Sequence, residues 1–208
     1  SHPIDFSDTL IEEYKNPKLA SNLHLPVQSG SDLILSKMKR KHTVLEYKNI
    51  IKRVRKIRPN ISLTSDFIVG YPGESDYDFE QTLNLVEELK FDDAYSFIYS
   101  PRPGTPASYE QDDTENTVKK KRLQTLQNLL KRTSKEFACK MLGTKEEILV
   151  EGISARNKNE LFGRTSSNKV INFSGLPNLI GKFINVRVTE LRSSTLKGKF
   201  LKLCKHNN

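Results

Sequence analysis

The stretch ISLTSDFIVGYPGES (61–75) joins a strand-like segment to a rigid turn. Its first ten residues alternate between an apolar face that includes Phe67 and a polar face that includes Thr64 and Asp66, the pattern of a strand with one buried side. Glycine and proline then end the strand, because proline restricts its own backbone and glycine adopts conformations that other residues rarely reach. We therefore expect a half-polar strand followed by a tight loop that carries Glu74.

Strand-like and helix-like segments alternate over the first two thirds of the chain. We expect strands at 22–27, 61–70 and 94–100, and helices after Ser31, Thr43 and Ser75 and from about Thr114 to Met141. A serine can cap a helix by accepting a hydrogen bond from a free N–H group, and Thr43 with Glu46 has the spacing of a capping box. Strands that alternate with helices indicate βαβ units and a parallel sheet.

The polar face continues onto the preceding strand, through His24 and Gln28. A polar inner face fits a barrel lumen that holds a ligand better than a sheet covered by apolar helices on both sides. The alternative is that Ser62, Thr64 and Asp66 satisfy one another and the nearby backbone. Because three βα units alone leave an unpaired sheet edge, the pattern predicts an α/β fold that is the C-terminal half of a parallel barrel.

Three glycine- and proline-containing loops follow the predicted strands. They are QSGS (28–31), GYPGE (70–74) and YSPRPGTP (99–106). In parallel barrels, binding sites form in the loops at the C-terminal ends of the strands, and the helix N-termini that follow favour a carboxylate or phosphate. The three loops together predict a ligand site at one rim of the barrel.

The positive charge is concentrated in the last third of the chain. The net charge of +9 divides into 12 Lys and Arg against 5 Asp and Glu in residues 141–208, and 22 against 20 in residues 1–140. Such asymmetry is typical of a nucleic-acid-binding module, the alternative being a solvated basic surface. Short strand-like segments separated by turn residues predict a small antiparallel β-barrel, OB-like in plan. We expect domains at 1–140 and 141–205.

Cations of this second domain are expected to neutralise RNA phosphates. The candidates are Arg164, Lys169, Arg187, Arg192 and Lys197. Phe162 and Phe173 are candidates for stacking on bases, although core packing is the favoured alternative for both.

Cysteine usage and hydropathy exclude several classes of protein. Cys139 and Cys204 lie 65 residues apart, which excludes a CxxC pair and a cluster-binding triplet within this chain. No apolar run approaches the roughly 20 residues that span a bilayer. We expect no membrane partner and a cytoplasmic location. The first residue is serine rather than methionine, which is compatible with a longer protein.

Several segments closely resemble the radical S-adenosylmethionine (SAM) methylthiotransferases. In the first domain they are HLPVQSGSD (24–32), SDFIVGYPGES (65–75) and FIYSPRPGTPA (97–107). In the second domain ILVEG (148–152), GRTSSNKVINF (163–173) and LIGKFINVRVTE (179–190) resemble the TRAM domain of the same family, whose SLKGK motif is altered to STLKGK (194–199). The branch that methylthiolates N6-isopentenyladenosine next to the anticodon of tRNA is the most similar; the ribosomal-protein branch is less so.

The resemblance implies a SAM site at the rim. Its contacts would come from Gln28, Ser29, Asp66, Gly70, Gly73, Glu74, Tyr99 and Ser100. The first two would lie near the ribose and methionyl part, Asp66 would point into the lumen, Glu74 would brace its loop, and backbone at the last two would meet the adenine. Arg102 is a candidate contact to the substrate.

The resemblance also implies two [4Fe–4S] clusters held by cysteine triplets, because soft thiolates suit these clusters. Neither Cys139 nor Cys204 matches a ligand position, so we expect the ligands outside this chain, no catalytic residue within it and no activity from it alone. The intact enzyme would act on tRNA as a monomer supplied by an electron donor. It would cleave SAM to a 5′-deoxyadenosyl radical, and a second SAM would supply the methyl group. The alternatives are a non-catalytic RNA-binding remnant, or a related methylthiotransferase acting on another tRNA adenosine or a ribosomal protein.

Overall fold

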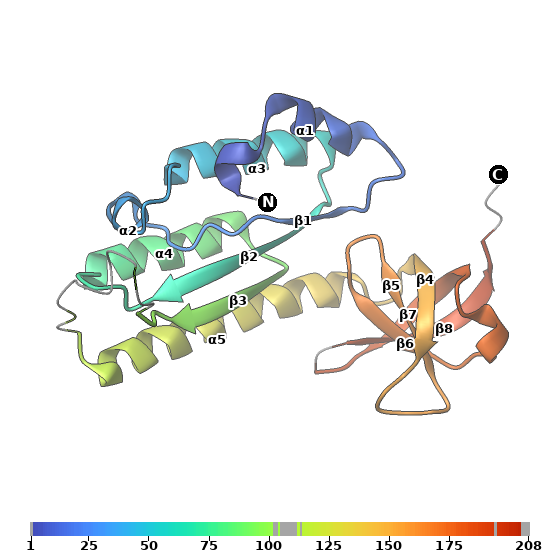
Figure 1. Ribbon diagram of the computed structural model, residues 1–208. Coiled ribbons are helices and arrows are strands. Elements are labelled where there is room, and N and C mark those ends of the chain that lie inside the picture. Colours follow the sequence, from blue (N-terminus) through green and yellow to red (C-terminus); the bar gives the residue numbers. More distant parts are fainter. Residues whose placement is uncertain (1, 102–103, 105–111, 113, 194, 205–208) are drawn as a thin grey trace. The chain divides into compact units, whose positions relative to one another are not determined.

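The computed structural model describes residues 2–101, 104, 112, 114–193 and 195–204 (Figure 1). The chain divides into two compact units. The first, which we call the α/β unit, comprises Ser1–Leu19 and Leu23–Ser134. The second, which we call the barrel unit, comprises Ala20–Asn22 and Lys135–Asn208. Each is described here by itself.

Among the described residues, three strands and five α-helices build the α/β unit. In chain order its elements are η1 Pro3–Asp5, α1 Asp8–Glu12, η2 Glu13–Lys15, β1 Asn22–His24, α2 Asp32–Lys37, α3 Val44–Ile57, β2 Ser62–Val69, α4 Asp76–Leu89, β3 Asp93–Ile98 and α5 Asn116–Lys140, whose last turns belong to the barrel unit. The predicted alternation of strands and helices is confirmed. The short helices before β1 were not predicted from the sequence, because segments of three to five residues are too short to show helical periodicity.

The helix starts follow from capping side chains. The Ser31 hydroxyl accepts from the Ile34 N–H, and Thr43 and Glu46 form the predicted capping box. The Ser75 hydroxyl accepts from the Asp78 N–H while the Asp78 carboxylate accepts from the Ser75 N–H. This second capping box uses an aspartate where glutamate or glutamine is usual. The sequence therefore predicted Ser75 as the cap of α4 but did not predict the role of Asp78.

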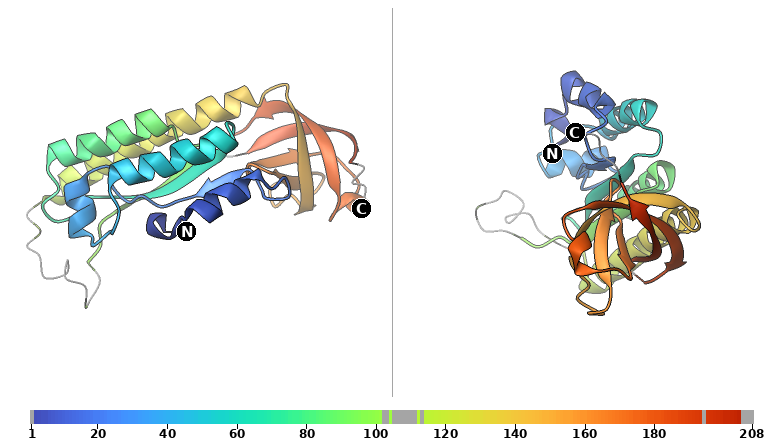
Figure 2. Two further views of the ribbon diagram at one scale, coloured as in Figure 1. Left: turned by 90° about the horizontal axis from the view of Figure 1, so that it is seen from above. Right: turned by 90° about the vertical axis from the view of Figure 1, so that its right-hand side faces the viewer.

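The sheet order is β1-β2-β3, and β2 and β3 run parallel, with Thr64 opposite Asp93 and Asp66 opposite Tyr95. Strand β1 is shorter than predicted, but the chain after it continues along β2 through the bridge between Gln28 and Phe67. One face of β2 is buried together with side chains of α3, α4 and α5, which lie along one side of the strands (Figure 2). The predicted division of β2 into an apolar and a polar face is confirmed.

The loop after β1 packs directly on the backbone of α4. A Cβ atom placed on Gly30 would lie 2.5 Å from the Gln81 carbonyl oxygen. We predict that Gly30→Ala lowers the free energy of unfolding by about 1–3 kcal/mol, because the loop and the helix must move apart.

Gly143→Ala is the matched control, since nothing lies within 4 Å of its added Cβ and only its positive φ of 79° opposes the change. Urea unfolding followed by circular dichroism measures both variants. A loss below about 1 kcal/mol at Gly30, which is not among the positive-φ glycines, would contradict the packing explanation.

The barrel unit is a closed five-stranded barrel. Its strands are β4 Lys145–Ile153, β5 Leu161–Thr165, β6 Val170–Phe173, β7 Phe183–Leu191 and β8 Leu196–Leu203, and a short helix η4 Pro177–Leu179 precedes β7. The order around the barrel is β4-β5-β6-β8-β7. Four neighbouring pairs are antiparallel and β6 pairs with β8 in parallel, so the expected antiparallel barrel is closed by one parallel pair. Among the described residues no helix is long and apolar enough to cross a membrane.

Candidate functional site

The polar face of the sheet gathers a histidine, a threonine and an aspartate. His24 Nδ1 lies 3.0 Å from Thr64 Oγ1, and His24 Nε2 lies 3.6 Å from Asp66 Oδ2. Arg40 approaches from the loop after α2: burial lowers the pKa of its guanidinium, and the charge of Asp66 opposes that shift. This polar cluster agrees with a ligand-facing lumen. It agrees only in part with the alternative that Ser62, Thr64 and Asp66 satisfy one another, because Thr64 and Asp66 both partner His24 and the Ser62 hydroxyl is buried without a hydrogen-bond partner.

Two aromatic side chains extend this face. Tyr95, opposite Asp66, is 68% exposed, and Phe97, opposite Ile68, is 55% exposed. The described residues leave this side of the sheet open, unlike the side covered by helices. It can therefore present both polar and aromatic groups to a ligand.

The loop after β1 places Gln28 at the carboxyl end of the sheet. Its backbone has a positive φ of 77°, its N–H donates to the Asp66 carbonyl and its carbonyl accepts from the Ile68 N–H. Ser29 is fully buried, and its hydroxyl lies 3.4 Å from Thr82 Oγ1 and accepts from the Ser31 N–H. Its hydroxyl is therefore engaged within the protein.

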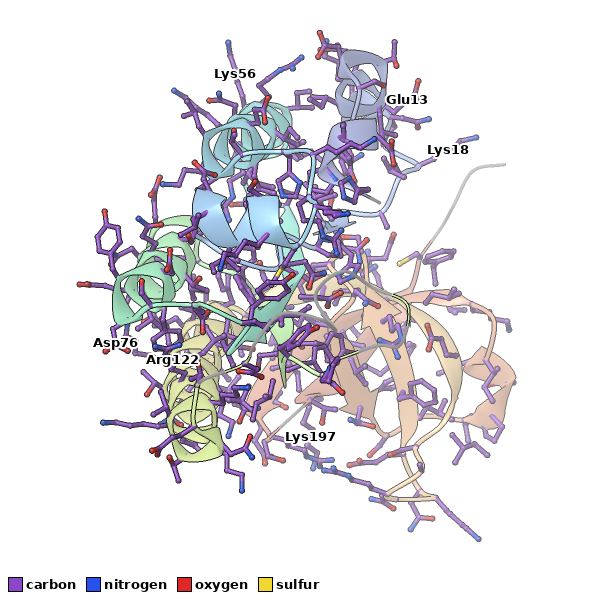
Figure 3. The ribbon with its side chains drawn as sticks, turned by 60° about the vertical axis from the view of Figure 1, so that its left-hand side comes forward. Glu13, Lys18, Lys56, Asp76, Arg122 and Lys197 are labelled. Carbon is purple, nitrogen blue, oxygen red and sulfur yellow. The ribbon has the colours of Figure 1, made fainter. Side chains whose placement is uncertain are left out.

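The loop after β2 is held by the buried Glu74. Glu74 Oε2 accepts from the Gly70 N–H at 2.6 Å and from Arg122 Nη1 at 2.9 Å. Arg122 also donates to the Glu74 carbonyl and, through Nη2, to Asp76 Oδ1; Figure 3 shows Arg122 and Asp76 on neighbouring helices. Burial raises the pKa of Glu74, while the Gly70 N–H and Arg122 oppose the rise. Glu74 thus has the geometry of a residue that braces the loop.

Gly70 and Gly73 both have positive φ, 69° and 74°. A Cβ on Gly70 would lie 2.6 Å from Cγ of Lys119, a buried side chain of α5 that pairs with Asp112. Both the positive φ and the adjacent Lys119 side chain therefore require glycine at position 70.

At the end of β3, the Tyr99 N–H donates to the Val69 carbonyl, and the Tyr99 ring lies edge-on to Tyr71 with centroids 4.9 Å apart. Ser100 is exposed. Arg102 lies outside the described residues. The loops after β1, β2 and β3 thus begin at the same edge of the sheet, and the cofactor contacts assigned to their residues stay a prediction.

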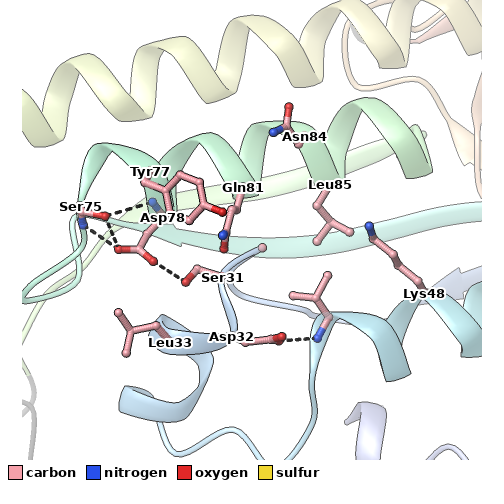
Figure 4. Close-up of a pocket in the computed structure, with 12 residues that line it drawn as sticks. Ser31, Asp32, Leu33, Lys48, Ser75, Tyr77, Asp78, Gln81, Asn84 and Leu85 are labelled. Carbon is pink, nitrogen blue, oxygen red and sulfur yellow. Dashed lines mark hydrogen bonds between the residues drawn. The ribbon is translucent and has the colours of Figure 1, made fainter.

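A cavity of about 530 Å³ lies elsewhere, between α2, α3 and α4 (Figure 4). None of the predicted cofactor-binding residues lines it. Ser31 donates to Asp78 and Asp32 accepts from the Val44 N–H at its wall, so these polar groups serve helix capping and loop attachment.

Several cations predicted to bind RNA are paired within the barrel unit. Arg192 donates twice to the buried Glu160, and Lys197 Nζ lies 3.8 Å from the same carboxylate. This pairing lowers the pKa of Glu160. Arg164 pairs with Glu151 at 3.2 Å.

The other predicted RNA contacts differ in their surroundings. Lys169 directly precedes β6, and Arg187 lies on β7 with an exposed side chain. Phe173 is fully buried in the barrel core, as the core-packing alternative predicted, and Phe162 is partly buried beside Gly152. The roles of the five cations in RNA binding stay a prediction.

Arg122 was missed by sequence reasoning. It lies 48 residues from Glu74 on a helix that carries many other Lys and Arg residues. No local pattern therefore distinguishes it as the partner of a loop carboxylate.

Comparison with known proteins identifies the class. Residues 1–86 match the Radical SAM superfamily and residues 140–201 match the TRAM domain. Coproporphyrinogen III oxidase from Escherichia coli, described as a radical SAM enzyme, has a similar fold, with a TM-score of 0.54 and 13% identity over 98% of this chain and 50% of that chain. The chain therefore combines part of a radical SAM barrel with a TRAM domain.

Its relatives are proteins named tRNA-2-methylthio-N(6)-dimethylallyladenosine synthase. Those of Histophilus somni (strain 129Pt) and Alkalilimnicola ehrlichii are 51% and 53% identical over 97% and 98% of this chain, and that of Yersinia enterocolitica is 53% identical over 97%. The chain spans about half the length of these relatives, 43% to 46%. The resemblance to the radical SAM methylthiotransferases expected from the sequence motifs is thus confirmed as a similarity that extends over nearly the whole chain.

The family uses SAM and an iron–sulfur cluster. The residues present here do not fit a cluster: the sequence has two cysteines, and among the described residues no three His, Cys, Asp or Glu side chains are placed to hold a metal ion. The open polar face offers the carboxylate of Asp66 and the imidazole of His24, groups that can hydrogen-bond to a SAM molecule.

Proposed function

We propose that this chain is part of an enzyme that methylthiolates N6-isopentenyladenosine next to the anticodon of tRNA. The 51% to 53% identity with the synthases, extending over 203 to 204 residues, carries the proposal. The α/β unit forms one wall of the SAM site and the barrel unit contacts tRNA. The domain division at 1–140 and 141–205 is part of the same proposal.

In this proposal Gln28, Asp66 and the backbone of Gly70 and Gly73 bind SAM from the rim, and Tyr99 and Ser100 flank the adenine. Ser29 supports the first loop, Arg102 contacts the substrate, and Glu74 acts as a positioning residue, because its carboxylate orients the Gly70 N–H and is held by Arg122. One bound SAM would supply a 5′-deoxyadenosyl radical once an iron–sulfur cluster outside this chain gave it an electron, and a second SAM would supply the methyl group. The residues of this chain orient the bound SAM.

We further propose two [4Fe–4S] clusters whose ligands lie outside these 208 residues, a separate electron donor, a monomeric enzyme and a cytoplasmic location. The chain alone would then have no activity. Anaerobic reconstitution of the 208 residues followed by iron and sulfide analysis tests the ligand assignment. Stoichiometric cluster on this chain would overturn it.

The reaction is tested by deleting the gene and analysing tRNA nucleosides by mass spectrometry. The 2-methylthio group should disappear while N6-isopentenyladenosine accumulates, and the intact gene should restore it. Unchanged methylthiolation would contradict the proposal and favour a non-catalytic RNA-binding protein. Loss of a methylthio group from another tRNA adenosine, or from a ribosomal protein analysed by peptide mass spectrometry, would assign a different substrate.

A further inference from the structure

The strand register of the barrel unit places three cations side by side. Lys145 of β4 lies opposite Arg187 of β7, and Arg187 lies opposite Lys199 of β8. All three side chains are exposed. Opposed residues of neighbouring strands share a face of the sheet, so the three cations form one row across the outside of the barrel. We call them the cation row.

Like charges placed directly opposite one another destabilise a sheet. Among the described residues no ion pair joins the cation row to a carboxylate, and the Arg187 guanidinium makes only a 3.4 Å contact to the Gly143 carbonyl. The neighbouring register carries Glu147, Asn185 and Lys202, so one acid faces a further cation there.

Three cations predicted from the sequence contrast with the row. Arg192 and Lys197 share the buried Glu160, and Arg164 pairs with Glu151. Their charge is already compensated inside the protein, whereas the cation row retains most of its charge for an external anion.

An exposed ring lies on the same face. Phe183 is 43% exposed and is four residues before Arg187 on β7, so both side chains point outward from the barrel. The separation is about 13 Å along the strand. Cations beside an exposed aromatic ring form the combination with which proteins bind single-stranded nucleic acid, the cations neutralising phosphates and the ring stacking on a base.

We propose that the outer face of β4, β7 and β8 is the RNA-binding face of the barrel unit. The cation row neutralises backbone phosphates, and Phe183 stacks on an unpaired base. This inference rests on the proposed function, which names tRNA as the partner, and it specifies the surface and the mode of contact.

The first test compares two double variants of the 208-residue chain that remove equal charge. Lys145→Gln with Lys199→Gln alters the cation row. Arg156→Gln with Lys158→Gln alters the exposed loop after β4, at the opposite end of that strand from Lys145. Affinity for a labelled anticodon stem-loop RNA is measured by fluorescence anisotropy at several salt concentrations.

The row variant should bind roughly tenfold to fiftyfold more weakly at about 0.1 M salt, and the slope of log affinity against log salt should fall by about 1.4 to 1.8, because two phosphate contacts are lost. The loop variant should change affinity less than about threefold. The melting temperature of the row variant should not fall, since removing opposed like charges relieves repulsion. Equal weakening in the two variants would mean that net charge alone acts, which overturns the proposal.

The second test uses Phe183→Ala with Phe183→Tyr as the conservative variant. The alanine should weaken binding to the stem-loop by about fivefold or more, the tyrosine should restore it, and an RNA duplex without unpaired bases should bind all three proteins alike. Equal loss on stem-loop and duplex would contradict stacking.

Anionic lipid vesicles are the third probe, because cations beside an aromatic ring can also meet a membrane surface. Row-dependent binding to vesicles without binding to RNA would overturn the assignment. If the row variant of the intact enzyme keeps full RNA affinity while methylthiolation proceeds, the assignment of the RNA-binding face is wrong. The proposed function is unaffected by that result. If gene deletion leaves the tRNA nucleosides unchanged although the cation row binds RNA, the proposed function is wrong. The assignment of the RNA-binding face is then still supported.

Discussion

Replacing Arg122 with alanine is expected to lower the free energy of unfolding of the α/β unit by about 3–5 kcal/mol at neutral pH. The side chains of Arg122 and Glu74 are 8% and 1% exposed, and their charged groups lie 2.9 Å apart. Removing one partner of a buried ion pair leaves the other charge without compensation in a place that water does not reach. Urea unfolding at pH 7 measures the loss.

Asp76→Ala is the matched control, because Asp76 bonds to the same guanidinium but its side chain is 98% exposed. An exposed pair contributes less than about 1 kcal/mol. The double variant Glu74→Gln with Arg122→Ala should recover part of the loss, since an amide carries no charge to bury. If the double variant is no more stable than Arg122→Ala, the loss comes from packing of the arginine stem.

The loss of stability caused by Arg122→Ala should depend on pH in a defined direction. Burial already raises the pKa of Glu74 in the folded protein, and loss of Arg122 raises it further. A carboxyl whose folded pKa exceeds its unfolded pKa destabilises the fold once pH exceeds the unfolded value, and the full cost is present above the folded value. The destabilisation should therefore shrink as the pH falls through the folded pKa of Glu74 and be smallest below about pH 4, where the group is mostly protonated in both states. An equal loss at pH 4 and pH 7 would contradict the charge explanation.

Asp66→Ala in the intact enzyme should weaken SAM binding by about tenfold to a hundredfold, because a hydrogen bond to a charged group contributes about 1.5–3 kcal/mol. Asp66 lies on the open face, 3.6 Å from His24 Nε2 and within the field of Arg40. Equilibrium dialysis with labelled SAM measures the effect, and tRNA affinity should remain nearly unchanged.

Asp66→Asn separates charge from shape, because it keeps the size of the side chain and one acceptor oxygen. We expect an intermediate loss from it. If SAM binding and cleavage survive Asp66→Ala intact, Asp66 is only a structural residue of the sheet, paired with His24.

Local chemistry was sufficient to predict much of this protein from its sequence. The alternation in 61–70 predicted which side of β2 is buried, because side-chain direction in a strand follows the residue order alone. Ser31, Thr43 and Ser75 located three helix starts because a cap depends on residues three positions apart. The motifs around GYPGE and GRTSSNK predicted the resemblance to the radical SAM methylthiotransferases, which the comparisons confirm.

Only the tertiary structure decided which groups meet. Arg122 reaches Glu74 across 48 residues, and Arg192 reaches Glu160 across 32. The cation row exists because the register of the barrel aligns Lys145, Arg187 and Lys199. A sequence reports the number of charges and their local spacing, whereas the energy of a charge depends on its distance to other charges and on its exposure to water. Both are set when strands pair and helices pack, so the compensated and the available cations of this chain can be distinguished only in the folded protein.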